Sequence, residues 1–205
     1  MANYMSNNIE EVHEYRILNK QLATLKVQAG FVEGVAEGKR TFNDITKMYG
    51  SIFGNNKEYC VILWNGIPFR LSYTEDLPCI IVPFSKMLKT LLERTEKEWQ
   101  IDFKSNHFEA CWYFSLDKNQ MLTISGNFYK VAGGHEKAIN TLAIVRIAEE
   151  DFLKEWKLLL EQYLKGYEDS GSVLKNINDL FIIEDLKNAN NRIKNKALRY
   201  QYDKR

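Results

Sequence analysis

Residues 59–73, with the sequence YCVILWNGIPFRLSY, contain two runs of alternating side chains on either side of an Asn-Gly pair. Asn65 and Gly66 suit a two-residue type I′ turn, because both central residues of that turn have positive φ. A period of two is typical of strands that bury one face. The sequence therefore predicts an antiparallel hairpin, in which Pro68 lies at an outer edge because proline has no N–H to donate.

Four further runs predict strands. Residues 79–82 (CIIV) indicate a short buried strand, and residues 108–116, 121–131 and 141–147 follow it along the chain. In the run 108–116, alternate positions place five apolar side chains on one face, Phe108, Ala110, Trp112, Phe114 and Leu116. These runs predict a sheet whose neighbouring strands are neighbours in the sequence.

Helices are predicted where apolar residues recur every three or four positions. This period occurs in residues 9–27, 45–52 and 149–167, in a helix opened by Pro83, and in a last helix from about Ser172. Thr41 and Asp44 resemble a weakened capping box before the second helix. Residues 29–40 are interpreted as a loop or a frayed helix end, and residues 132–140 as a loop.

The order of these elements indicates the fold class. Strands that follow one another without regular helix alternation favour an α+β fold over a doubly wound one. We expect an antiparallel sheet of about five to seven strands, with N-terminal helices, one inserted helix and two C-terminal helices. Residues 1–186 are predicted to form one domain, and residues 187–205 a basic C-terminal tail whose composition favours disorder.

The composition is that of a globular protein in a reducing compartment. Of the 205 residues, 45% are hydrophobic and 27% charged, and only three are cysteines, which does not suggest a disulfide framework. The N-terminus lacks the basic and apolar regions of a secretory signal. No apolar run reaches the roughly 18 residues that a membrane span needs. We expect a cytoplasmic protein without a membrane partner.

Charge is unevenly distributed along the chain. Residues 187–205 hold seven of the 28 basic residues and one of the 27 acidic residues, which leaves a net charge of −5 on residues 1–186. An acidic body would attract a basic partner and repel nucleic acid, whereas the tail has the opposite tendency.

Motifs for chemistry are missing from the sequence. It has no phosphate-binding loop, no HExxH and no paired CxxC. His107, Glu109 and Cys111 alternate along one strand, and Cys111 with His135 is the one nucleophile–base pair that the sequence offers. We interpret these side chains as the solvated face of a sheet, and expect no catalytic residue, no metal ligand and no cofactor.

The candidate binding residues therefore lie in loops and at chain ends. Tyr73, Glu75 and Asp76 follow the hairpin, and Glu149, Glu150 and Asp151 begin a helix, so these six are predicted to contact another protein. As an alternative, the tail would touch nucleic acid through its basic and aromatic residues, namely Arg192, Lys194, Lys196, Arg199 and Tyr200.

Two stretches resemble a protein family. Residues 125–164, a last strand followed by an F-L-x-E-W helix, and residues 79–99 are similar in texture to small bacterial immunity proteins of polymorphic toxin systems. The resemblance covers residues 58–167 and implies a non-enzymatic protein that neutralises a toxin. A phage or mobile-element factor that inhibits or scaffolds a host machine is the alternative, and an enzyme without local motif is the second. No oligomeric state is predicted.

Overall fold

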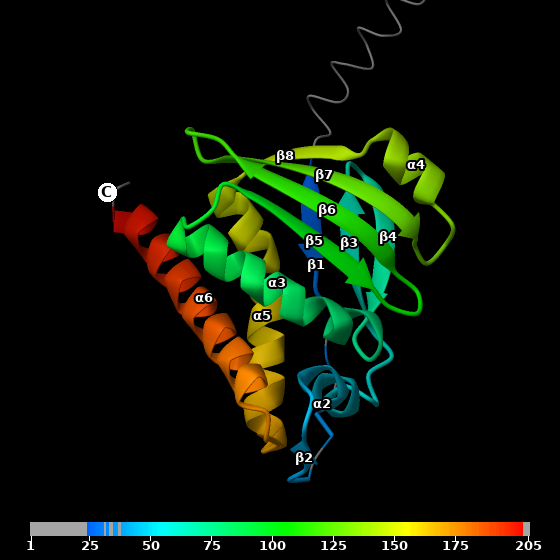
Figure 1. Ribbon diagram of the computed structural model, residues 1–205, viewed down its shortest axis with the longest axis vertical. Helices are drawn as coiled ribbons and strands as arrows, with labels where there is room; N and C mark the ends of the chain where they lie inside the picture. Colours follow the sequence, from blue (N-terminus) through cyan, green and yellow to red (C-terminus); the bar gives the residue numbers. More distant parts are fainter. Residues whose placement is uncertain (1–23, 31, 33–34, 37, 203–205) are drawn as a thin grey trace, which may run out of the picture.

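The computed structural model describes residues 24–30, 32, 35–36 and 38–202, with side chains described up to residue 193. Within this part of the chain there are five helices and nine strands (Figure 1). The two larger sheets are antiparallel, and helices surround them, so the α+β prediction is confirmed.

The four-stranded sheet consists of β5 (Glu98–Lys104), β6 (Glu109–Leu116), β7 (Met121–Lys130) and β8 (Ile144–Ala148). The strands lie in the order β5-β6-β7-β8, so neighbours in the sheet are neighbours in the sequence, as predicted for β6, β7 and β8. The alternation of β6 is also confirmed, because Ala110, Trp112 and Phe114 are all buried on one face. Strand β5 was not predicted, although Trp99, Ile101 and Phe103 alternate in it.

A second, three-stranded sheet contains the predicted hairpin. Strand β3 (Tyr59–Trp64) pairs with β4 (Ile67–Ser72), and β1 (Leu25–Gln28) pairs with the other side of β3. Asn65 and Gly66 have φ angles of 49° and 82°, as the type I′ turn requires. The five to seven antiparallel strands that were predicted thus divide between two sheets.

Strand β1 also corrects the helix predicted over residues 9–27. Leu25 faces Trp64 and Val27 faces Ile62 across the ladder, so pairing with the hairpin determines the conformation of this segment. The rest of the predicted helix, residues 9–23, lies outside the described residues.

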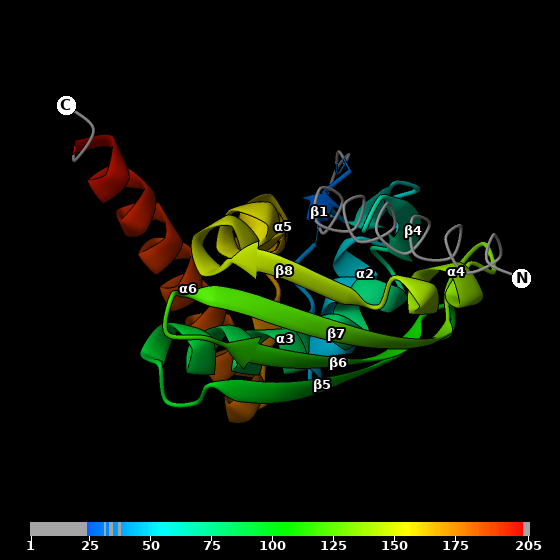
Figure 2. The ribbon, with the colours of Figure 1, turned by 90° about the horizontal axis from the view of Figure 1, so that it is seen from above.

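Five helices complete the described part of the fold: α2 (Ile45–Ile52), α3 (Asp76–Glu93), α4 (Glu136–Thr141), α5 (Glu149–Ser170) and α6 (Ile177–Tyr202). Helices α3, α5 and α6 lie on one side of the four-stranded sheet (Figures 1 and 2). Helices α2 and α5 match their predictions. Asp44 is the N-cap of α2 and accepts from the Lys47 N–H, whereas Thr41 belongs to the two-residue strand β2 (Thr41–Phe42).

Helix α3 overturns the prediction of a strand at 79–82 and of a helix opened by Pro83. One helix contains both segments, with Pro83 in its interior. Leu77, Ile81, Phe84 and Leu88 recur three or four positions apart and are all buried, so the helical period continues through the supposed strand.

Smaller differences concern the ends of elements. The predicted loop 132–140 contains most of α4, and the strand expected at 141–147 begins only at Ile144. The last helix begins at Ile177, after strand β9 (Val173–Leu174) has paired in parallel with β2. The boundary predicted at residue 187 lies within α6, where Ala189 and Ile193 are buried.

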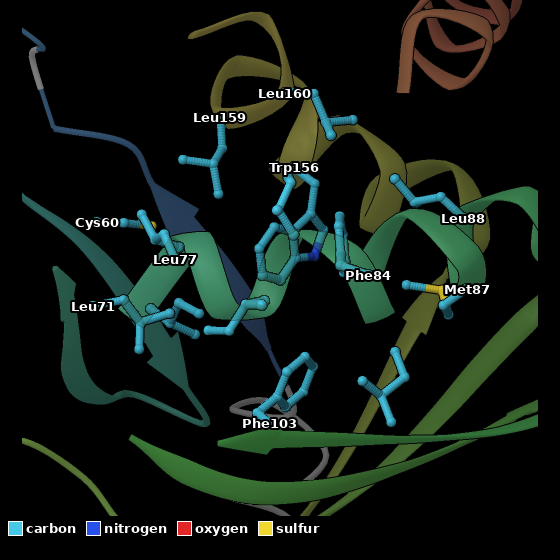
Figure 3. Packing of buried hydrophobic residues seen from close by; sticks show 14 of the residues in the cluster. Cys60, Leu71, Leu77, Phe84, Met87, Leu88, Phe103, Trp156, Leu159 and Leu160 are labelled. Atoms are coloured by element: carbon cyan, nitrogen blue, oxygen red, sulfur yellow. The ribbon is translucent and has the colours of Figure 1, made fainter. Parts of the chain in front are cut away.

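The core lies between the two sheets and the helices. Trp64 of β3 packs against Trp112 of β6, with ring centroids 5.0 Å apart. Gly126 allows this approach, because a Cβ there would lie 3.0 Å from an atom of the Trp64 ring. On the helical side, Trp156 of α5 packs against Phe84 of α3, with centroids 4.3 Å apart (Figure 3). The inner face of the four-stranded sheet is therefore covered by the three-stranded sheet and by the helices.

Candidate protein-binding surface

The outer face of the four-stranded sheet is not covered by any described helix (Figure 2). We call this side the outer face and define it by residues of alternating position on the four strands. They are Glu98, Gln100, Asp102, Cys111, Tyr113, Ser115, Thr123, Ser125, Asn127, Tyr129, Ile144 and Arg146. An antiparallel sheet with one solvated face is common, but that face is then usually polar throughout.

Three large side chains interrupt the polar character of this face. Tyr113 is 43% exposed, Tyr129 is 62% exposed and Ile144 is 58% exposed, and they come from β6, β7 and β8 respectively. Tyrosine is enriched at protein interfaces, because its ring buries a large apolar area while its hydroxyl still bonds. Single exposed apolar residues are ordinary, and three of them on adjacent strands of one face make this face the candidate contact surface.

The strand register places two of these side chains in one row. Tyr113 pairs with Ser125, and Ser125 pairs with Ile144, so the small serine separates the two large residues. Ser115 and Thr123 form the next row, and the same region holds a depression of about 390 Å³ lined by Gln100, Tyr113 and Ser125, among others. A depression beside exposed aromatic rings is the arrangement in which a partner side chain is anchored.

Cys111 lies beneath this surface and is not a reactive thiol. It is buried on the outer face, where it pairs with Asp102 of β5 and Asn127 of β7. Burial is the main cause that raises the pKa of the Cys111 thiol, so the thiol is protonated near neutral pH. A hydrogen bond with Cys111 is also the main cause that raises the pKa of Tyr113, and Tyr129 adds to that shift.

Three of the six predicted contact residues are buried, which is a correction to the prediction for Tyr73, Asp76 and Glu149. The Tyr73 hydroxyl donates to Gln162 Oε1 at 2.7 Å, and burial raises the pKa of this phenol. Glu149 accepts from Arg94 Nη2 at 2.8 Å and thereby links the start of α5 to the end of α3. Buried side chains with internal partners cannot form a docking surface in this conformation.

Asp76 is bonded to one residue that is close in the sequence and to one that is distant. It accepts from the Ser72 N–H at 2.8 Å and from Ser105 Oγ at 2.5 Å. Ser105 Oγ also accepts from the Phe108 N–H at 3.0 Å and so closes the turn between β5 and β6. His107 Nδ1 lies 3.3 Å from Glu75 Oε2, on the exposed side of this cluster. Ser105 bonds to the Asp76 carboxylate directly, and His107 Nδ1 lies 3.8 Å from the same carboxylate, so the cluster joins the start of α3 to the turn between β5 and β6.

The other three predicted contacts, Glu75, Glu150 and Asp151, are at least partly exposed, but they do not lie together. Glu75 is next to the turn that precedes β6, since Asn106 Nδ2 bonds to it at 3.4 Å. Glu150 and Asp151 pair with Lys154 at the start of α5, near the turn that follows β6. Eight residues of strand span roughly 25 Å, so these carboxylates are near opposite ends of the sheet. Their role in binding stays a prediction.

The proposed nucleic-acid residues lie in or near the end of α6. Arg192 is exposed, whereas the side chains of Lys194, Lys196, Arg199 and Tyr200 lie outside the described part of the structure. Their role therefore stays a prediction as well.

Neither a metal site nor a membrane-spanning helix is found among the described residues. No group of three histidine, cysteine, aspartate or glutamate side chains in this part of the chain has the geometry to hold a metal ion. His107 contacts Glu75 rather than pointing along the strand to Glu109 and Cys111. None of the helices that the structure describes is long and apolar enough to cross a bilayer.

Comparison with known proteins gave no relative. No protein-family model, no curated protein and no solved structure matches this chain.

The sequence analysis did not predict the exposed residues of the outer face, although the sequence contains a pattern that indicates one of them. Once the apolar face of 108–116 is assigned, Tyr113 falls on the opposite face, where a polar residue is expected. An aromatic residue at a position of the solvated face is therefore the pattern that indicates this surface. Tyr129 and Ile144 could be added only after the register of β7 and β8 was known.

Proposed function

We propose that this chain is a non-enzymatic protein-binding module that contacts its partner through the outer face of the four-stranded sheet. The observation that carries the proposal is the exposure of Tyr113, Tyr129 and Ile144 on three adjacent strands. The raised pKa of Cys111 and the internal hydrogen bonds of Ser105 support a binding role over nucleophilic catalysis.

Toxin neutralisation is the most specific version of this proposal. It is supported by the resemblance of residues 125–164 to immunity proteins and by the net charge of −5 on residues 1–186. The strand-then-helix order of that stretch occurs here as β8 and α5, whereas residues 79–82 are helical. A phage or mobile-element factor that binds a host machine is the second version, and in it the same surface would bind another protein.

A matched set of tyrosine variants tests the proposal. The tagged chain is expressed in its native host with the neighbouring genes, and bound proteins are identified by mass spectrometry. We expect one stoichiometric partner with the natural chain and its loss, by about tenfold or more, with the double variant Tyr113→Ser, Tyr129→Ser. The control is Tyr59→Ser, because Tyr59 is 46% exposed on the other sheet. Equal capture by all three proteins, or no partner at all, would contradict the proposal.

A further inference from the structure

Strand β5 is at an edge of the four-stranded sheet, and its outward backbone groups are free among the described residues. Lys97 O accepts from Leu116 N, and Ser105 N donates to Phe108 O, each at 2.8 Å. Since pairs with and without hydrogen bonds alternate in an antiparallel ladder, Trp99, Ile101 and Phe103 also bond to β6. The N–H and C=O groups of Glu98, Gln100, Asp102 and Lys104 therefore point away from the sheet. No hydrogen bond from another described residue reaches them.

Each of the other edges of the two larger sheets in the described structure carries a feature that hinders pairing. On β1, Glu155 Oε2 accepts from the outward Val27 N–H at 3.0 Å. On β8, Asn65 Nδ2 donates to the carbonyl of Ile144 at 2.9 Å. On β4, Pro68 has no N–H to offer at an outward position. Proteins commonly protect edges in these ways, whereas on β5 no such bond from a described residue and no proline occupies an outward position, and helix α3 lies alongside the strand.

A groove runs between this edge and helix α3. Its volume is about 530 Å³, and its walls include Lys86, Met87 and Thr90 of α3 and Gln100 of β5. A new strand lies about 4.8 Å from its neighbour. The groove thus offers hydrogen-bonding groups on one wall and the aliphatic part of a helix on the other, as sites for strand addition do.

The charged residues that line the groove indicate which kind of strand would bind there. Glu96, Glu98 and Asp102 line it together with one basic residue, Lys86. Antiparallel pairing of two copies of β5 about Gln100 would place Glu98 opposite Asp102, and like charges directly opposite each other are destabilising. This register disfavours a second copy, and lysine or arginine on an incoming strand would face the carboxylates of Glu98 and Asp102.

We propose that β5 accepts an extended, lysine- or arginine-rich strand of the partner protein, which continues the four-stranded sheet along its free edge. The inference rests on the proposed function in so far as this strand belongs to a protein partner. The edge itself can be tested with peptides, independently of the tyrosines.

The probe is a pool of fluorescein-labelled peptides of about ten residues, with Lys at alternate positions and Val, Thr or Tyr between them. A matched pool carries Glu in place of Lys. By fluorescence anisotropy with the full chain, we expect the Lys pool to bind about tenfold more tightly than the Glu pool, and to bind less tightly at higher salt. In hydrogen exchange followed by NMR, the amides of Glu98, Gln100 and Asp102 should become protected. Equal affinity of the pools, no binding of either, or protection confined to other strands would overturn the proposal.

Two variants at one position separate the backbone from the side chain. Gln100→Pro removes an outward N–H without breaking a bond to β6, and proline is tolerated at such edge positions. Gln100→Thr keeps the N–H and a residue that favours strands. We expect about tenfold weaker peptide binding for the proline variant and a change below about twofold for the threonine variant. Unchanged binding by a folded proline variant would overturn the proposal, and Glu98→Gln with Asp102→Asn provides the second check, since it should reduce the preference for Lys peptides.

The outcomes also distinguish the two proposals. Tyr113 and Tyr129 do not line the groove, so peptide binding should survive in their serine variants. If the peptides fail while a tyrosine-dependent partner is captured, only the strand inference is wrong. If the peptides bind but no host partner is found, the edge is confirmed and the proposed function is not.

Discussion

The side chain of Asn65 joins three parts of the chain. Its Nδ2 donates to Leu142 O at 2.7 Å and to Ile144 O at 2.9 Å, and its Oδ1 accepts from the Thr24 N–H at 3.1 Å. The residue is buried and has a positive φ, which asparagine tolerates better than most residues. One residue thus forms the hairpin turn, connects the two sheets and covers the edge of β8.

This arrangement predicts that Asn65→Asp is strongly destabilising. Aspartate has nearly the same shape, but an ionised carboxylate cannot donate to the two carbonyls and would be buried without a cation. We expect a loss of about 2–4 kcal/mol in the free energy of unfolding, measured by urea denaturation at neutral pH. Asn55→Asp is the control, because Asn55 is exposed and the same change should cost less than about 0.5 kcal/mol there. A loss at Asn65 as small as in the control would mean that these bonds contribute little.

Helix α3 shows how an element is misread when local signals compete. Ile80, Ile81 and Val82 favour strands by propensity, and Pro83 is typical of a helix start. Packing decides otherwise, because Leu77, Ile81 and Phe84 lie on the face that the core buries. The helix therefore includes a proline at a position where the ring prevents a bond to the carbonyl four residues earlier.

Replacement of this proline should stabilise the helix. Ala at position 83 would restore the N–H and favours helix, so Pro83→Ala is expected to raise the free energy of unfolding by about 1–3 kcal/mol, as measured in urea. Pro78→Ala is the matched control, since Pro78 lies in the first turn, where no N–H bond is lost. If Pro83→Ala gave no gain, the core would need the helix shape that the proline imposes.

Whether each of the other elements could be predicted depends on whether it is stabilised by its own local pattern or by contacts with distant residues. The hairpin, α2, β6, β7 and α5 carry their own periodic patterns, and each was predicted from them. Strand β1 depends on pairing with Trp64 and Ile62, which are far away in the sequence, so no local pattern indicates it. The candidate surface depends likewise on register, since only the ladder brings Ile144 into a row with Tyr113.

The buried carboxylates show the same limit at the candidate site. Asp76 and Glu149 have the residue type of a surface patch, and the partners that bury them, Ser105 and Arg94, lie 29 and 55 positions away. Composition indicates a charged side chain but not the partner that the fold provides. Charge alone therefore does not distinguish a residue that binds a partner from one that holds the fold together.

At the scale of the whole molecule, buried weak acids set an alkaline limit to the fold. Burial raises the pKa of Cys60 to about 12 from an ordinary value of 9.0, and burial also raises the pKa values of Tyr49 and Tyr163. A group whose folded pKa is raised stabilises the native state below its unfolded pKa, and this contribution is lost as the pH rises toward the folded value.

The free energy of unfolding should therefore decrease from about pH 9 upward for the thiol and from about pH 10 upward for the two phenols, by about 1.4 kcal/mol per pH unit for each group. We expect Cys60→Ala to be less stable at pH 7 but to show a shallower decrease between pH 9 and pH 11, measured by urea denaturation. Lysines also lose protons in this pH range, but both proteins contain the same lysines. The difference in slope between the two proteins therefore reports the ionisation of Cys60 alone. Identical slopes would contradict a buried thiol with a raised pKa.

The order of the elements along the chain has a consequence for synthesis on the ribosome. The four strands β5 to β8 are consecutive, so their sheet is complete once residue 148 has emerged. Its inner face, however, packs against Phe152 and other residues of α5 that are made later. The nascent chain passes through a stage in which an apolar sheet face is open to other molecules, and such faces are bound by chaperones in the cell.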